Sequence, residues 1–133
     1  MWQKLVYLSL AGGIGTLARY GLSGLVQRWG DQVVKWLPWC EGFPWGTLSV
    51  NILGCFLFGL VWSLAESRLS LDSQAKLIVL TGFMGAFTTF STFGFESAQM
   101  WLEGQRLMLL ANLLMHNGLG LTAVWVGFVL GRV

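Results

Sequence analysis

A run of hydroxyl-bearing residues set among phenylalanines is the part of this sequence best suited to chemistry. Residues 81–96 read TGFMGAFTTFSTFGFE, with glycines ahead of the hydroxyl side chains of Thr88, Thr89, Ser91 and Thr92. Glycine and adjacent β-branched threonines both weaken a helix. A helix interrupted here would free backbone carbonyls that could hold a small cation such as Na⁺. The hydroxyls could donate hydrogen bonds to an anion.

Two further polar pairs have the four-residue spacing that places side chains on one face of a helix. Thr47 and Asn51 form the first pair, and the Asn51 amide nitrogen can donate two hydrogen bonds to an anion. Asn112 and His116 form the second pair, which could make a polar stripe. Each pair also has a structural interpretation, because Asn and Thr commonly join helices within membranes. A histidine can likewise be packed in its neutral form.

Two charged residues lie at the boundaries of uncharged sequence. Arg19 separates the uncharged stretches 5–18 and 20–27, and Glu96 ends the stretch 77–95. An arginine at membrane depth needs a polar partner or a watery face. Glu96 could supply that partner, although the sequence does not fix the distance between the two. Arg19 is therefore either a structural anchor or a residue that helps to attract an anion.

The sequence does not predict an enzyme. No nucleophile–base pair is evident, and no cluster of metal-binding side chains is present. His116 is the one histidine of the chain, which is too few for a histidine-based metal site. The formal net charge of +2 is too small to indicate a nucleic-acid partner.

Composition indicates a membrane protein. Hydrophobic residues make up 55% of the chain and charged residues 11%, whereas soluble domains carry about 25% charged residues. The stretches 42–65, 77–95 and 107–131 are uncharged, and about 20 mostly apolar residues suffice to cross a bilayer as a helix. We therefore expect an all-α membrane protein whose single domain, 1–133, has four transmembrane helices, with the third broken at mid-membrane. The expected helices cover residues of about 4–28, 45–66, 75–102 (broken near 83–89) and 106–131.

The charges in the loops give a weak orientation signal. With four helices, the N-terminus, the second loop and the C-terminus share one side of the membrane, and the first and third loops share the other. The positive residues of the first side are Lys4, Arg68, Lys76 and Arg132, and those of the other side are Arg28, Lys35 and Arg106. Positive charge in short loops sets orientation, and here it is almost balanced. We therefore expect insertion both ways round, which would permit an antiparallel homodimer.

The polar segments occur in an order that is found in a known family. Gly12-Gly13-Ile14-Gly15 precedes Arg19-Tyr20, Gly46-Thr47-Leu48-Ser49-Val50-Asn51 precedes Gly54, and the segment 81–96 follows. This order resembles the Fluc (CrcB) family of fluoride channels over nearly the whole chain. The most specific part is the string Gly-x-x-Gly-x-x-Thr-Thr-Phe-Ser-Thr-Phe of residues 82–93.

The resemblance implies a passive, fluoride-selective channel of the cell inner membrane that exports fluoride from the cytoplasm and lowers its toxicity. It implies a multi-pass, dual-topology antiparallel homodimer in the lipid bilayer, with two pores. It also implies a structural Na⁺ on the two-fold axis, held by the backbone carbonyls of Gly85 and Thr88. A fixed Na⁺ together with Arg19 would raise the local potential for anions.

The same resemblance assigns roles along the pore. The family's pore phenylalanines match Phe90 and Phe93, and electropositive ring edges could face an anion. The pore asparagine matches Asn51. His116 matches a fourth-helix polar track in which many relatives have a hydroxyl, and a later position of that track falls on Gly120. The remaining matches are the hydroxyls of Thr47, Ser91 and Thr92 in the pore, with Glu96 in a structural or electrostatic role.

Two other functions remain open at this point. One is a small dual-topology, proton-coupled multidrug exporter, which depends on a carboxylate deep in its first helix. The first apolar run holds Arg19 and no Asp or Glu, which disfavours that function. The other is a non-transporting membrane assembly subunit, which would give no ion flux after purification.

Overall fold

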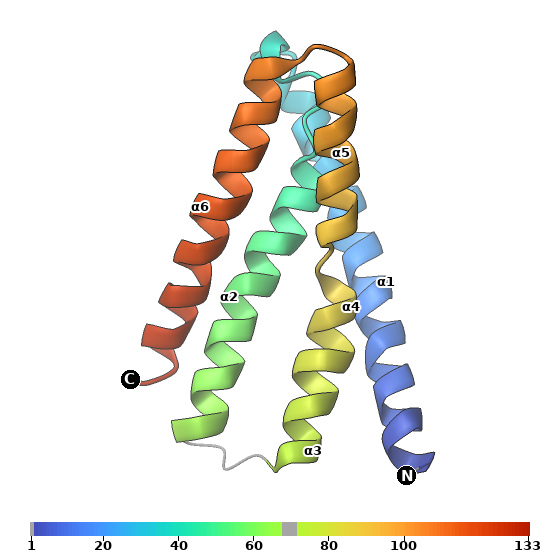
Figure 1. Cartoon of the computed structure of the whole chain (residues 1–133), viewed down its shortest axis with the longest axis vertical. Coiled ribbons are helices and arrows are strands. Elements are labelled where there is room, and N and C mark those ends of the chain that lie inside the picture. Colours follow the sequence, from blue (N-terminus) through green and yellow to red (C-terminus); the bar gives the residue numbers. More distant parts are fainter. Residues whose placement is uncertain (1, 68–71) are drawn as a thin grey trace.

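The chain forms long helices that run alternately up and down the long axis of the molecule (Figure 1). The computed structural model describes residues 2–67 and 72–133, so Arg68 of the charge count lies outside the described residues. Both termini lie at the same end (Figure 1). Every regular element within these ranges is helical. The elements are α1 Trp2–Val33, η1 Pro38–Cys40, α2 Trp45–Ser67, α3 Ser73–Lys76, η2 Leu77–Met84, α4 Gly85–Phe87, α5 Phe90–Leu102 and α6 Arg106–Leu130.

Three helices in the described part of the chain are long and apolar enough to cross a membrane. They are α2, the segment Ser73–Leu102 and α6. At 32 residues α1 is longer than any of them, but it is not one of the three, and Arg19 interrupts its apolar run. Large apolar side chains such as Leu10, Leu121 and Trp125 are exposed along these helices, as expected of surfaces that face lipid rather than water.

The segment Ser73–Leu102 changes its backbone conformation twice. After α3, the segment continues as the π-helix η2, which sequence reasoning did not predict. Helical structure continues through α4 and then stops at Thr88 and Thr89, whose backbones are extended. The helix is therefore broken only at residues 88–89, the end of the stretch 83–89 in which the break was expected. π-Helical turns are often found at functional sites, and this one leads directly to the break.

Glycines let the helices pack closely. A Cβ atom at Gly59 of α2 would collide with the carbonyl of Val124 in α6, and one at Gly127 would collide with the carbonyl of Phe56. On the other side of the molecule, a Cβ atom at Gly15 of α1 would collide with the Phe83 carbonyl of η2. The α2–α6 pair and the α1–η2 pair are thus held at short backbone distance, which fixes the position of the break between them.

The connection between α1 and α2 is folded over the end of the helices. Its η1 turn buries Cys40, which belongs to a hydrophobic cluster with residues from α2, α5 and α6. Gln27 of α1 anchors the connection, because its Nε2 donates to the Phe43 carbonyl at 3.1 Å and its Oε1 accepts from the Gly46 N–H at 3.1 Å. The cluster comprises Cys40, Phe43, Leu48, Met100 and Met108.

Candidate functional site

The helix break is held open by an exchange of hydrogen bonds with α2. The Thr89 N–H donates to the Asn51 Oδ1 atom at 2.8 Å, and the Asn51 Nδ2 atom donates to the Thr89 carbonyl at 3.1 Å. Thr89 also caps α5, since its hydroxyl oxygen accepts from the Thr92 N–H at 3.2 Å. Side-chain groups thereby replace the intrahelical bonds that the break removes. Asn51 consequently acts as a backbone clamp.

These caps leave particular carbonyls without their helical donors. In a continuous helix the Gly85 carbonyl would accept from the N–H of Thr89, and the Thr88 carbonyl from the N–H of Thr92. Those two N–H groups instead donate to Asn51 and to the Thr89 hydroxyl. The Gly85 and Thr88 carbonyls, whose residues are matched from the family to a Na⁺ site, therefore lack these donors, as do carbonyls at helix ends in general. Carbonyls freed at a helix break are a usual way for a protein to hold a small cation.

A cavity of about 300 Å³ lies beside the break, between α2, α5 and α6. We call it the break cavity. Asn51, Phe90, Phe93 and His116, all assigned to the pore by resemblance, line it together with Thr88. No carboxylate of the described residues lines it. Its remaining lining residues are Gly54, Cys55, Phe58, Asn117 and Val124.

Aromatic side chains form one wall of the break cavity. The Phe93 ring is 8% exposed and lies between two others, with ring centroids 5.6 Å from Phe90 and 4.3 Å from His116. Both ring pairs are tilted rather than parallel, so that ring edges as well as faces are presented. Phe90 is 82% exposed. One phenylalanine is thus fixed by packing, whereas the other has most of its surface uncovered.

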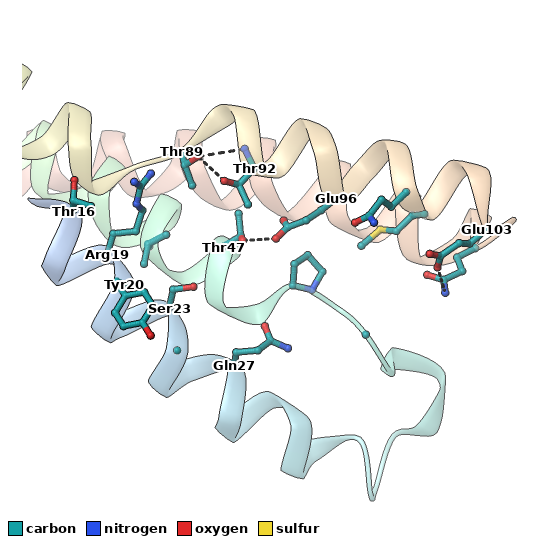
Figure 2. A pocket seen from close by; sticks show the side chains of 17 residues that line it. Thr16, Arg19, Tyr20, Ser23, Gln27, Thr47, Thr89, Thr92, Glu96 and Glu103 are labelled. Atoms are coloured by element: carbon teal, nitrogen blue, oxygen red, sulfur yellow. Dashed lines mark hydrogen bonds between the residues drawn. The ribbon is translucent and has the colours of Figure 1, made fainter.

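A second cavity, of about 720 Å³, lies between α1, α2 and α5 (Figure 2). We call it the vestibule. Arg19 reaches it from α1, and Thr47 and Glu96 reach it from α2 and α5. The Thr47 hydroxyl donates to Glu96 Oε1 at 2.6 Å, and the other carboxylate oxygen of Glu96 is buried without a hydrogen-bond partner in the described ranges. The Thr47 hydroxyl, which the resemblance assigned to the pore, thus donates its hydrogen to a carboxylate.

Arg19 and Glu96 share the vestibule without forming an ion pair. In residues 2–67 and 72–133 the one salt bridge joins Lys76 to Glu66. The partner that the sequence suggested for Arg19 is therefore hydrogen-bonded to Thr47 instead. Two carboxylates, Glu96 and Glu103, line the vestibule together with the half-buried Arg19 guanidinium, so the guanidinium offsets part of their negative charge there.

The hydroxyl track of α5 begins at the break. The Thr92 hydroxyl lies 2.8 Å from that of Thr89, and the Ser91 hydroxyl lies 3.3 Å from it. Thr92 lines the vestibule (Figure 2), whereas Ser91 lines neither cavity, and both side chains are exposed. The cluster therefore faces outward from the single chain at the level of the break.

Comparison with known proteins decides the family. The model of the CrcB-like protein, Camphor Resistance (CrcB) family matches residues 6–128. The chain belongs to the CrcB-like family. It is 50% identical over 133 residues to a protein of Nitrosococcus oceani, 52% identical over 133 residues to one of Solidesulfovibrio magneticus, and 49% identical over 134 residues to one of Nitratidesulfovibrio vulgaris.

These alignments cover whole chains. The matches take in 100%, 100% and 98% of this chain and 99%, 99% and 98% of the three relatives, in the same order. Each relative bears the name fluoride-specific ion channel FluC. The resemblance seen in the sequence is thereby confirmed, and the three apolar helices together with channel relatives identify a multi-pass membrane protein.

This CrcB-like protein also contains a buried series of hydrogen bonds that sequence reasoning missed. Asn112 of α6 is fully buried, and its Nδ2 donates to the Ser97 hydroxyl at 3.0 Å. Ser97 in turn donates to the Phe93 carbonyl at 2.7 Å. The available signal was the four-residue spacing from Phe93 to Ser97, which lets a hydroxyl reach a carbonyl one turn earlier. These two hydrogen bonds join the backbone of Phe93 to α6.

Proposed function

We propose that this protein is a fluoride-selective channel through which fluoride leaves the cytoplasm passively. The observation that carries the proposal is the break cavity, which combines an amide, an imidazole and phenylalanine rings, with no carboxylate from the described residues. Such a lining suits a small anion, because it has no negative charge that would repel the ion. The relatives named as fluoride-specific ion channels support the same conclusion.

Selectivity follows from the donors available to replace water. The Asn51 Nδ2 atom carries two hydrogens, of which one is donated to the Thr89 carbonyl. The second hydrogen remains for an anion in the break cavity, whereas the Ser91 and Thr92 hydroxyls lie outside that cavity, beside the Thr89 hydroxyl. The edges of the Phe90 and Phe93 rings add weakly positive contacts. Fluoride is small enough to be surrounded by these groups, whereas chloride is too large for a narrow passage.

The exposed surface at the break is best explained by a second copy of the chain that packs against it. Phe90 is 82% exposed, and the neighbouring Ser91 and Thr92 hydroxyls also lie at the surface. Polar groups at membrane depth are covered by protein or by water rather than by lipid. An antiparallel homodimer, with α1 as a fourth membrane-spanning helix, would cover this surface and create two equivalent pores. The almost balanced loop charges favour insertion in both orientations.

The released carbonyls of Gly85 and Thr88 fit a structural Na⁺. Their helical donors are taken by Asn51 and the Thr89 hydroxyl, and hard cations prefer oxygen ligands. Two copies of this pair at a two-fold axis would supply four carbonyl oxygens. When bound, the ion would supply fixed positive charge to the pore region and tie the two chains together. Asn51 contributes by holding the break open.

The direction of transport follows from chemistry outside the protein. Undissociated hydrogen fluoride enters through lipid and ionises at neutral pH inside the cell. An inside-negative potential drives the anion outward at about 2.3 kcal/mol per charge for each 100 mV. A passive path in the inner membrane therefore lowers internal fluoride by using this potential as its driving force. Arg19 in the vestibule would raise the local anion concentration.

Efflux from proteoliposomes tests this function. Vesicles loaded with fluoride or with chloride, with Na⁺ present or replaced by a larger cation, are supplied with a potassium ionophore to balance charge. Rapid fluoride release and retained chloride are the expected results, with no requirement for a proton gradient. Chloride release equal to that of fluoride would overturn selectivity. The absence of any release would favour a non-transporting subunit, and release that needs a proton gradient would favour an exporter.

A further inference from the structure

The connection between α1 and α2, residues 34–44, is apolar on both of its sides. Its inner side buries Cys40 and Phe43 in the hydrophobic cluster with α2, α5 and α6. Its outer side carries Trp36 and Leu37, which are 84% and 43% exposed. Tryptophan side chains are mostly well buried in folded proteins. The outer side of the connection therefore lacks the apolar surroundings that its side chains would favour.

The connection lies at the level where the helices end. The hydrophobic cluster holds it against Met100, near the end of α5, and Met108, near the start of α6. The turn between these helices joins the segment Ser73–Leu102 to α6, and both are long and apolar enough to cross a membrane. Figure 1 shows the connection and this turn at the same end of the molecule. The ends of two membrane-crossing helices mark the level of the lipid headgroups, so the connection lies at that level.

Other exposed tryptophans lie at the same end of the molecule. Trp29 is exposed near the end of α1, and Trp101 is exposed in the last turn of α5. The Arg106 guanidinium lies 3.5 Å from the centroid of the Trp101 ring. Tryptophan rings gather at membrane–water boundaries, and arginine side chains there keep their charge in water. Trp29, Trp36 and Trp101 thus mark one boundary of the membrane.

The charges around the connection favour an apolar attachment over an ionic one. Between residues 28 and 41 the charged side chains are those of Arg28, Asp31, Lys35 and Glu41, and their formal charges cancel. Attraction to anionic lipid requires a cluster of Lys and Arg near the surface. A charged protein partner would likewise need an excess of one sign. Apolar contact is therefore the interaction that this surface can supply.

We propose that the outer side of the connection, formed by Trp36 and Leu37, docks into the bilayer at the level of the phospholipid headgroups. The ring of Trp36 lies among the upper acyl chains, and its indole N–H points toward water. The connection also contributes Gly42 and Pro44 to the lining of the vestibule. Docking therefore places the vestibule beside the water–lipid boundary, where ions arrive from water.

Tryptophan fluorescence in phosphatidylcholine vesicles tests this docking, because these lipids carry no net charge. The emission of Trp36 is the difference between the wild type and Trp36→Phe, a substitution that leaves no cavity because the side chain is largely exposed. Phosphatidylcholine brominated on the upper acyl chains should remove most of this emission, because the ring lies among those chains. Iodide added on both faces of the vesicles should remove little of it.

Two reference variants calibrate the quenching. Glu41→Trp adds a ring at an exposed, charged position of the same connection, and its added emission should be quenched by iodide and not by brominated lipid. The emission lost in Trp45→Phe reports a ring that is covered by protein, since the Trp45 ring packs against Gly30 and its Nε1 atom is buried. That emission should respond weakly to both quenchers.

The outcomes distinguish lipid from the other occupants of this surface. Quenching of Trp36 by brominated lipid and not by iodide supports the docking. Quenching by iodide to the extent seen for Glu41→Trp means that the connection lies in water, and this overturns the proposal. Weak quenching by both agents, as for Trp45, means that a second copy of the chain covers Trp36, and this also overturns it.

Discussion

The vestibule and the break cavity lie on either side of α5 and differ in size and charge. The vestibule, at about 720 Å³, is lined by the charged side chains of Arg19, Glu96 and Glu103. The break cavity, at about 300 Å³, has neither a carboxylate nor a guanidinium among its described lining residues. Thr47 and Asn51, one helical turn apart on α2, belong to one cavity each. One turn of α2 therefore separates a charged chamber from a neutral one.

This difference suggests that the two cavities act on anions in different ways. A fixed charge in a wide, wet cavity acts over distance on any anion and distinguishes poorly between them. Close packing of neutral donors and ring edges acts only on contact and depends strongly on ion size. We therefore expect substitutions in the break cavity to alter which ion passes, and substitutions in the vestibule to alter how fast anions arrive.

The largest effect is expected at Phe93. Replacing it with leucine removes the ring edges and the contact with His116, and fluoride flux should fall about a hundredfold or more if the pore depends on those edges. Phe95→Leu is the matched control, since Phe95 lies on the same helix, is exposed and lines neither cavity. Flux from proteoliposomes gives the rates, and gel filtration verifies assembly. Unchanged flux in Phe93→Leu would remove the ring from the mechanism.

The sequence predicts the elements of this site better than their contacts. Uncharged stretches indicated α2, the segment Ser73–Leu102 and α6, because membrane helices are defined by local composition. The break could be placed near Thr88 and Thr89 because their effect on helices is also local. The π-helix that precedes it carries no local signal of this kind.

Hydrogen-bond partners on different helices depend on tertiary distances, so the sequence indicates only candidates for them. Glu96 was matched with Arg19 by charge, whereas its hydrogen-bond partner is Thr47. Asn51 was predicted as an anion donor, but its use as a clamp on the Thr89 backbone depends on how closely α2 approaches the break. Ser97 and Asn112 bond only because α5 and α6 are neighbours.

A smaller effect, and one of a different kind, is expected at Arg19. Arg19→Gln removes the positive charge from the vestibule, so at low ionic strength its fluoride current should be about threefold below that of the wild type. At about 1 M salt of an impermeant anion this difference should disappear, because screening removes the effect of the charge from the wild type. Arg28→Gln makes the same charge change on the same helix outside the vestibule and should have little effect. Fluoride-over-chloride selectivity should be unchanged in both variants. Loss of selectivity in Arg19→Gln would contradict the division between the cavities.

The smallest effect on conduction is expected at Thr47, where stability should change instead. Thr47→Val keeps the shape of the side chain but removes the hydroxyl that donates to Glu96. Neither carboxylate oxygen of Glu96 would then have a hydrogen-bond partner in this partly buried site, which should lower the free energy of unfolding by about 1–3 kcal/mol. Thermal unfolding in detergent should show a lowered midpoint. Thr122→Val is the control, since that hydroxyl is exposed and bonds within its own helix to the Gly118 carbonyl. If Thr47→Val instead abolished flux while leaving the midpoint unchanged, the Thr47 hydroxyl would belong to the permeation path and the boundary between the two cavities would have to move.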